Sequence, residues 1–231
     1  MIEAGMTDCQ TFDDRASLEA SLAAHVAARL REALTQREQA FLVLSGGSTP
    51  VNLLELLSME ALDWHRVIVL LADERWVDAC STDRNERMIR QQLLQNQAAA
   101  AEFLPLITTL DDQVGNIASL NTLLASLPTF DVVILGMGED GHTASLFPCA
   151  RELREGLATP LSALVTRPTQ APHERVSLSR QRLQNSREII LHIVGETKRR
   201  VFQDACISGD PSRFPIAAFT ESVCFNCYWA P

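Results

Sequence analysis

The feature of this chain that most constrains its fold is a series of short, largely apolar runs without regular polar alternation. These runs are separated by segments with helical periodicity, so strands and helices are expected to alternate along the chain. The strand-like runs are "FLVLS" at 41–45, "VIVLLAD" at 67–73, "FDVVILGMG" at 130–138, "LSALVT" at 161–166, "RVSLS" at 175–179, "EIILHIVG" at 188–195 and "VCFNCYW" at 223–229. The helical segments are 17–36, 50–57, 83–95, 112–127 and 197–206.

Strands that are apolar on both faces are typical of a mainly parallel sheet with helices on each side. The sequence therefore predicts an α/β fold with three α/β/α layers and a mainly parallel, doubly wound, Rossmann-like sheet. A length of 231 residues suits one such domain, which is expected to span 1–231.

The charge balance restricts the partners that such a domain could have. A net charge of -9 argues against a nucleic-acid or anionic-membrane surface, although a local basic cluster could still bind an anionic substrate. No apolar run approaches the roughly 20 residues of a membrane helix. Residues 1–14 lack a signal-peptide core, so a cytoplasmic location is expected.

The chain has six cysteines, which are scattered along its length. They are Cys9, Cys80, Cys149, Cys206, Cys224 and Cys227. Without an export signal, all six are expected to be reduced thiols. Cys224 and Cys227 form a C-x-x-C pair, but it lies in an apolar run with no second pair of ligands nearby. No metal site is therefore predicted.

A turn rich in glycine and hydroxyl residues, "SGGSTP", follows the first apolar strand. It comprises Ser45, Gly46, Gly47, Ser48, Thr49 and Pro50. One interpretation is a plain strand-to-helix loop, with Thr49 as N-cap and Pro50 as the first helical residue. The other is an anion site, because small residues leave backbone N–H groups uncovered at the positive end of a helix.

Chemically active side chains recur just after the predicted strands, where parallel sheets bind their ligands. Those that could act together are Asp73, Arg75, Asp140, His142, Arg167, Arg175 and Lys198. An aspartate two residues before a histidine can hold and polarise the imidazole, and arginine and lysine beside a Gly–Ser turn can bind phosphate. Each residue alone could equally be a helix cap, a surface charge or a turn residue.

The motifs that are absent also narrow the chemistry. There is no G-x-S-x-G around a nucleophilic serine and no H-E-x-x-H metal spacing. Acid–base work on a small phosphorylated compound, without a metal or a covalent intermediate, is the chemistry that remains.

Gly136, Gly138 and Gly141 also satisfy G-x-G-x-x-G, the fingerprint of a dinucleotide site. Pro148 leaves room for only a short helix after them, and the next strand is followed by Arg167 rather than by an acid. A site for NADP, which can use an arginine, stays open as an alternative.

Five motifs together resemble a known family. "SGGSTP", "ADERWV", "GMGEDGHTASLFP", "RVSLS" and "GETK" occur in this order in 6-phosphogluconolactonases, and the resemblance spans about 15–229. These enzymes belong to a superfamily with glucosamine-6-phosphate deaminases and sugar-phosphate isomerases, which implies a NagB/RpiA/CoA-transferase-like fold. The resemblance implies hydrolysis of 6-phospho-D-glucono-1,5-lactone to 6-phosphogluconate, the second step of the oxidative pentose phosphate pathway, without a cofactor.

The resemblance also implies roles at the reacting end of the substrate. His142 is expected to be the general base that activates water, with Asp140 behind it. Arg75 is expected to stabilise the oxyanion. Asp73 is expected to contact sugar hydroxyls or to orient Arg75.

For the phosphate, the resemblance implies contacts from the Gly–Ser turn and charge from two cations. The turn residues are Ser45, Gly46, Gly47, Ser48 and Thr49, and the cations are Arg167 and Lys198. Family members often have Lys-Pro-Pro before the "RVSLS" strand, whereas this chain has "TRPTQAPHERVSLS", so the roles of Arg167 and Arg175 stay open.

Two other functions remain as alternatives. Amino-sugar phosphate deaminases have a ring-opening glutamate five residues after the histidine, and Phe147 stands at that position here. A sugar-phosphate sensor domain would need a DNA-binding module, for which a first core helix starting near residue 17 is expected to leave no room. The expected partner is a small-molecule substrate, and the chain is expected to be a monomer or at most a weak homodimer.

Overall fold

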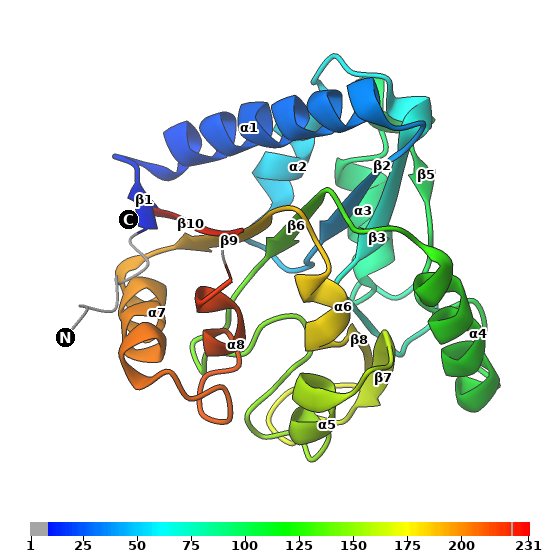
Figure 1. Ribbon diagram of the computed structural model, residues 1–231, viewed down its shortest axis with the longest axis vertical. Coiled ribbons are helices and arrows are strands. Elements are labelled where there is room, and N and C mark those ends of the chain that lie inside the picture. The colour runs from blue at the N-terminus through cyan, green and yellow to red at the C-terminus, as the bar shows by residue number, and fades with distance from the viewer. Residues whose placement is uncertain (1–8, 223) are drawn as a thin grey trace.

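A seven-stranded sheet forms the centre of the computed structural model, which describes residues 9–222 and 224–231 (Figure 1). Every neighbouring pair of strands in this sheet is parallel. The order is β1 (Cys9–Thr11), β10 (Phe225–Ala230), β9 (Ile189–Val194), β6 (Val132–Leu135), β2 (Ala40–Leu44), β3 (Val67–Leu71) and β5 (Glu102–Phe103). The predicted parallel α/β sheet is thus confirmed; Val223, at the start of its last expected strand, lies outside the described residues.

Helices cover both faces of the sheet, as the alternating pattern predicted. In Figure 1, α1 and α2 lie above the sheet, whereas α6, α7 and α8 lie below it. The helices are α1 (Arg15–Gln36), α2 (Val51–Ser58), α3 (Asn85–Gln92), α4 (Gln113–Ser126), α5 (Leu153–Ala158), α6 (Arg180–Gln184), α7 (Glu196–Ser208) and α8 (Ala217–Thr220), with short 3₁₀ helices at Trp64–Arg66 and Asn96–Ala100. No helix in the described part of the chain is long and apolar enough to cross a membrane.

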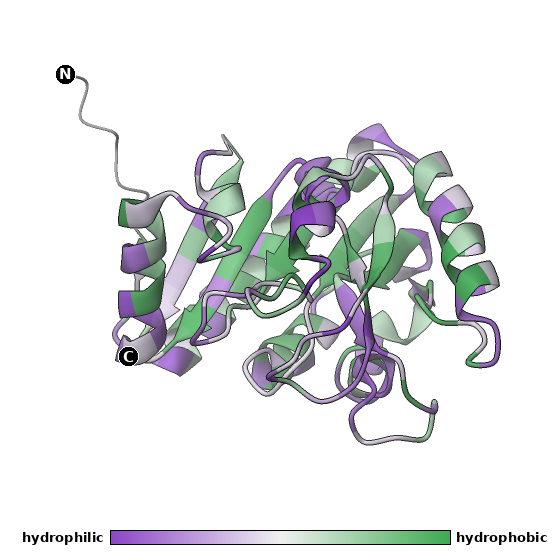
Figure 2. Ribbon diagram, turned by 90° about the horizontal axis from the view of Figure 1, so that it is seen from below, coloured by the Kyte–Doolittle hydropathy of each residue, from purple (hydrophilic) through white to green (hydrophobic). Residues whose placement is uncertain are grey.

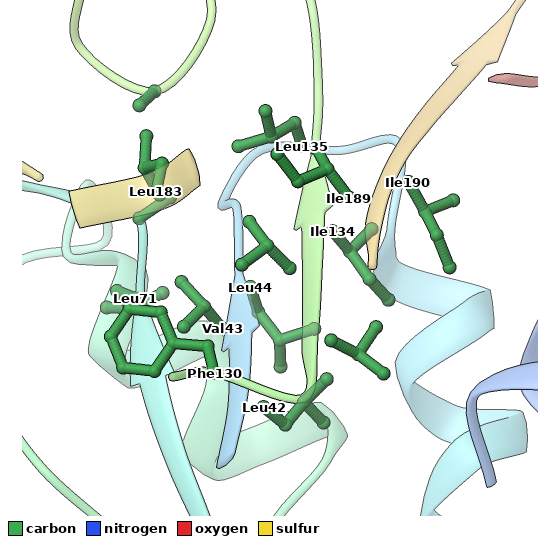
Figure 3. Packing of buried hydrophobic residues seen from close by; sticks show 14 of the residues in the cluster. Leu42, Val43, Leu44, Leu71, Phe130, Ile134, Leu135, Leu183, Ile189 and Ile190 are labelled. Carbon is green, nitrogen blue, oxygen red and sulfur yellow. The ribbon is translucent and has the colours of Figure 1, made fainter. Parts of the chain in front are cut away.

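The core lies between these helices and the sheet. Leu18, Leu22, Val26 and Leu30, each four residues apart, form the buried stripe of α1 and are fully buried, and Leu34 one turn further on is partly buried. Figure 2 shows hydrophobic colour concentrated along the central strands, and Figure 3 shows leucines of β2 packed beside isoleucines of β6 and β9. Burying such a side chain contributes about 1.5–3 kcal/mol, so this contiguous core holds the strand ends in place.

Two of the predicted strands do not join the parallel sheet. β7 (Ala163–Thr166) and β8 (Arg175–Leu178) instead form a small antiparallel sheet with β4 (Asp73–Arg75), in the order β4-β8-β7. The chain changes partners at Ala72, whose N–H donates to Leu44 of the first sheet while its carbonyl accepts from Leu178. As a result, the predicted strand 67–73 ends at Leu71, and residues 73–75 lie against β8.

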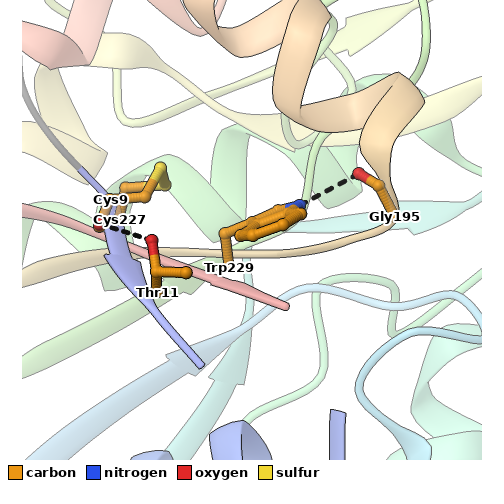
Figure 4. Close-up of a disulfide and its surroundings, with 5 residues drawn as sticks. All are labelled: Cys9, Thr11, Gly195, Cys227 and Trp229. Carbon is orange, nitrogen blue, oxygen red and sulfur yellow. Dashed lines mark hydrogen bonds between the residues drawn. A yellow bond between two sulfur atoms is a disulfide. The ribbon is translucent and has the colours of Figure 1, made fainter. Parts of the chain in front are cut away.

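The prediction that all six cysteines are reduced was wrong. Cys9 and Cys227 form a disulfide between β1 and β10, with a Cα–Cα distance of 4.3 Å (Figure 4). They are 218 residues apart, so their spacing in the sequence carries no sign of the pairing. The parallel register places Cys9 directly opposite Cys227, and this brings the two thiols together. Cys80, Cys149, Cys206 and Cys224 are free.

Candidate active site

A pocket of about 250 Å³ opens where β2, β6 and β9 end, beside the small antiparallel sheet. Most residues predicted from the sequence to form the site line this pocket. They are Ser45, Gly46, Gly47, Ser48, Thr49, Asp73, Arg75, His142 and Lys198. Because parallel strands end at one edge of a sheet, turns that are far apart in the sequence meet here.

The Gly–Ser turn forms one wall of the pocket. Gly47 has a φ of 96°, a conformation that glycine adopts without strain. The Ser45 hydroxyl accepts a hydrogen bond from the N–H of Gly136 at 3.2 Å, which ties this turn to the loop after β6. This hydrogen bond links the turn directly to the loop that leads to His142.

The helix after the turn starts one residue later than predicted. Pro50, rather than Thr49, occupies the N-cap of α2, and its carbonyl accepts from the N–H of Leu54 at 2.9 Å. The Thr49 carbonyl accepts from the Arg15 guanidinium at 2.9 Å, which links the start of α1 to the turn. The N-terminus of α2, with its uncompensated N–H groups, therefore adjoins the turn.

His142 is held by Asp140 through two hydrogen bonds. The imidazole Nδ1 lies 2.5 Å from the Asp140 carboxylate, which also accepts from the backbone N–H of His142 at 3.1 Å. A Cβ on Gly138 would lie 2.2 Å from the imidazole ring, so the close approach requires glycine there. The loop also brings the Thr143 hydroxyl onto the carbonyl of Gly136 at 2.8 Å.

The contact with His142 also affects the charge state of Asp140. Partial burial alone would raise the pKa of Asp140, but the hydrogen bonds from His142 and its electrostatic attraction outweigh this and hold the pKa below its usual value. The carboxylate is therefore anionic at neutral pH and accepts from Nδ1–H, which leaves Nε2 available for another group.

Phe147 lies directly beneath this imidazole. The rings of Phe147 and His142 are stacked, with centroids 3.9 Å apart. The guanidinium of Arg175 lies over the Phe147 ring at 5.1 Å from its centroid. Phe147 thus restricts the imidazole and supports a pocket cation, whereas the sequence indicated only that it replaces a carboxylate.

Asp73 faces Arg175 rather than Arg75. Its carboxylate accepts from the Ser145 hydroxyl at 2.5 Å and lies 3.6 Å from Arg175 Nη1. Arg75 instead donates to the Asp83 carbonyl at 2.6 Å. Burial lowers the pKa of Arg175, and the positive charge of Arg75 adds to this, while Asp73 opposes it. Arg75 and Arg175 are directly opposite each other in the β4–β8 pair and both line the pocket, so the two side chains stand on the same side of it.

The structure does not bring Arg167 together with the other predicted residues. Its side chain is half exposed and pairs with Glu174 at 2.9 Å and Glu152 at 3.5 Å, and it is absent from the pocket lining. Arg175 lines the pocket instead. The structure therefore places Arg175, and not Arg167, in the lining of the pocket.

Lys198 reaches the pocket from the first turn of α7. Burial lowers the pKa of Lys198, while the charge of Glu139 works in the opposite direction. A partly desolvated ammonium group at the end of a strand is well suited to an anion, because few water molecules compete with it.

Three residues near the pocket were not predicted. Asn85 and His192 line it, and Arg15 adjoins it through Thr49. His192 had a visible signal, because it is the one ionisable residue within the run "IILHIV". Arg15 and Asn85 had none, since each is brought in by a helix that starts elsewhere in the chain.

The three glycines do not form a dinucleotide site. After β6 the chain makes tight turns, with the Gly138 N–H donating to the His142 carbonyl and the Gly141 N–H to the Gly138 carbonyl. The next helix, α5, starts only at Leu153 and leads to β7 of the antiparallel sheet. A dinucleotide fingerprint needs a glycine turn that opens a crossover helix to a parallel strand, and that unit is not formed.

Comparisons with known proteins find relatives that match nearly the whole chain. A 6-phosphogluconolactonase of Pseudomonas putida is 40% identical over 220 residues, which cover 94% of this chain and 90% of that protein. The crystal structure of a 6-phosphogluconolactonase from Shewanella baltica OS155 matches with a TM-score of 0.94 at 42% identity, covering 98% of this chain and 99% of that one. A monomeric glucosamine-6-phosphate deaminase, 17% identical, shares the fold with a TM-score of 0.81.

A family described as glucosamine-6-phosphate isomerases/6-phosphogluconolactonase matches residues 13–229. Since this match covers nearly the whole chain and full-length relatives are about 40% identical, the chain belongs to the glucosamine-6-phosphate isomerase/6-phosphogluconolactonase family.

Proposed function

We propose that this protein hydrolyses 6-phospho-D-glucono-1,5-lactone to 6-phosphogluconate, the second step of the oxidative pentose phosphate pathway. The observation that carries the proposal is one pocket that contains both a carboxylate-held histidine and a Gly–Ser turn beside a lysine. The relatives that match nearly the whole chain are named 6-phosphogluconolactonases, which supports the same substrate.

His142 is the general base in this proposal. Its Nδ1–H donates to Asp140, so the Nε2 lone pair can accept a proton from water. That water attacks the lactone carbonyl carbon while its proton passes to Nε2. The C–O bond to the ring oxygen then breaks, and the ring oxygen takes up the proton held on Nε2, which returns His142 to its starting state. The carboxylic acid that is formed releases its own proton to solvent, so the product is a carboxylate.

Charge develops on the carbonyl oxygen during the attack. Arg75 and Arg175 are the cations on the wall of the pocket that can stabilise it. Asp73, which pairs with Arg175, is placed to orient that guanidinium or to accept from a sugar hydroxyl. A preorganised donor of this kind typically contributes about 10²- to 10³-fold in rate.

The phosphate is bound at the other end of the pocket. Gly46, Gly47 and Ser48 supply backbone N–H and hydroxyl donors, the N-terminus of α2 adds its dipole, and Lys198 adds a full charge. Ser45 and Thr49 complete this wall. Arg167 has no part in this proposal.

One residue, Phe147, argues against the alternative that this protein is an amino-sugar phosphate deaminase. The shared fold does not separate the two activities, because the deaminase noted above has it as well. Phe147 separates them, since an apolar ring stacked on the imidazole cannot supply the carboxylate that opens an amino-sugar ring. We further propose that residues 1–231 act as one catalytic domain, in the cytoplasm, as a monomer or weak homodimer.

A coupled assay tests the function. Lactone hydrolysis is followed through 6-phosphogluconate dehydrogenase, corrected for spontaneous opening, with and without a chelator. We expect full activity with the chelator and a loss of about 10²- to 10⁴-fold in kcat for His142→Ala, because a positioned general base contributes that much. The exposed His65, replaced by alanine, is the matched control. Wild-type hydrolysis no faster than the spontaneous rate would overturn the proposal.

A further inference from the structure

His192 is a buried imidazole in the wall of the phosphate end of the pocket. It lies on β9, one residue beyond the Leu135–Leu191 pair, and is thus level with Gly136. Its exposed fraction is only 2%. The glycines at this level of β2 and β6 have no side chains, so the imidazole is the side chain that β9 contributes to the pocket floor.

Neither ring nitrogen of His192 has a hydrogen-bond partner among the described residues, and Nε2 is wholly buried. Buried polar groups in folded proteins nearly always have partners, because an unpaired one loses its hydration without compensation. If His192 served only to fill the core, an apolar side chain of similar size would give a more stable protein, because it would bury no unpaired nitrogen. Nδ1 is not among the wholly buried unpaired atoms although it has no partner among the described residues either, so it is the ring nitrogen whose partner is expected to be a ligand in the pocket.

The surroundings of His192 indicate the charge of that ligand. Arg15 of α1 and Lys198 of α7 both place positive charge near the ring, and Arg15 is bonded to the Thr49 carbonyl of the Gly–Ser turn. Burial lowers the pKa of His192 to about 4, with a further contribution from these two cations. At neutral pH the ring is therefore uncharged and carries one N–H donor, in a pocket that attracts anions.

We propose that His192 is a further phosphate ligand, which donates a ring N–H to a phosphate oxygen and raises the preference for phosphorylated over unphosphorylated lactones. This inference rests on the proposed function for the identity of the substrate. Because neither ring nitrogen is bound to any described residue, the phosphate selects the tautomer that donates to it. Lys198 supplies charge and the Gly–Ser turn supplies backbone N–H groups, whereas His192 supplies a directed neutral donor from the sheet.

Calorimetric titration with inorganic phosphate tests this ligand role without relying on activity. His192→Leu removes both ring nitrogens but keeps an apolar side chain of similar size, and His192→Gln keeps an N–H donor. We expect at least tenfold weaker phosphate binding for His192→Leu, which corresponds to about 1.4 kcal/mol, and binding within about threefold of wild type for His192→Gln. His65→Leu is the matched control, because that side chain is exposed.

Two further readouts separate a ligand from a structural residue. We expect the thermal midpoint of His192→Leu to equal or exceed that of the wild type, since an unpaired buried nitrogen is removed. We also expect a higher KM for the phosphorylated lactone and an unchanged kcat/KM for unphosphorylated glucono-1,5-lactone.

Phosphate binding by His192→Leu within twofold of wild type would overturn the inference, as would a wild-type protein that does not bind phosphate. A drop in the thermal midpoint of His192→Leu with unchanged phosphate binding would assign His192 to the core. If the wild type binds phosphate but does not hydrolyse the phosphorylated lactone, the proposed function fails and the role of His192 in binding an anion stands.

Discussion

Gly138→Ala is the substitution that most directly tests how His142 is positioned. The added Cβ would lie 2.2 Å from the imidazole Cε1 and Nδ1 and 2.7 Å from the Asp140 carboxylate. Carbon atoms in contact normally stand about 3.5–4.0 Å apart, so the ring must retreat by more than about 1 Å. Phe147 is stacked on the ring 3.9 Å away, and this limits how the ring can move without losing its place.

The expected cost follows from that displacement. Misplacing a catalytic group by about 1 Å lowers the rate by about 10²-fold, equivalent to about 2.7 kcal/mol of activation free energy. The general-base contribution of His142, about 10²- to 10⁴-fold, sets the upper limit. Alanine should add no left-handed backbone strain, because Gly138 does not have a positive φ, so any fall in the thermal midpoint would come from the displaced ring.

The measurement is kcat in the coupled lactonase assay, together with the thermal midpoint of the same preparation. The double variant Gly138→Ala/His142→Ala is the control. If Gly138 acts only by leaving room for the imidazole, the double variant is no slower than His142→Ala alone. A folded Gly138→Ala enzyme with kcat within threefold of wild type would refute this account, as would additive losses in the double variant.

Three other predictions follow from the charges and cross-links. Lys198→Ala should raise KM by about 10- to 150-fold, as expected for a charge-assisted phosphate contact, whereas Arg167→Ala should change KM by less than about threefold in the same steady-state assay. The pKa of His192 is about 4 in the folded protein, against an ordinary value of 6.5. As the pH falls from about 6.5 to about 4, the imidazole is therefore protonated in the unfolded chain but not in the folded one, and this favours unfolding. The wild type should therefore lose about 2–3 kcal/mol more stability than His192→Gln over this range in urea titrations at pH 7.5 and 4.5, and equal losses would contradict the shift. Reducing the Cys9–Cys227 disulfide should lower the free energy of unfolding by about 2–4 kcal/mol without changing kcat. Thiol titration of the denatured, unreduced protein should detect four free thiols among the six cysteines, and six free thiols would exclude the disulfide.

Much of the fold could be read from the sequence, because the relevant signals are local. Apolar runs of the length of a strand predicted all the main strands of the parallel sheet, and helical periodicity over 17–36 predicted α1. The Gly–Ser turn and the Asp140–His142 pair are also local, since each lies within a few residues of chain. Their convergence on one pocket followed from the rule that parallel strands end at a common edge.

Contacts that depend on which distant segments become neighbours could be decided only by the tertiary structure. The strand run before Asp73 looked continuous, yet the change of partner at Ala72 placed Asp73 against the antiparallel sheet and beside Arg175. The same packing left Arg167 among carboxylates outside the pocket.

The disulfide and the unpaired imidazole have a similar origin. Cys9 meets Cys227 only through the register of two parallel strands. That His192 has no partner among the described residues can be seen only once the groups packed around it are known. Burial and pairing are properties of the whole three-dimensional arrangement of the chain. A sequence pattern can therefore indicate that a side chain is chemically capable, whereas only the folded chain decides which groups reach it and which do not.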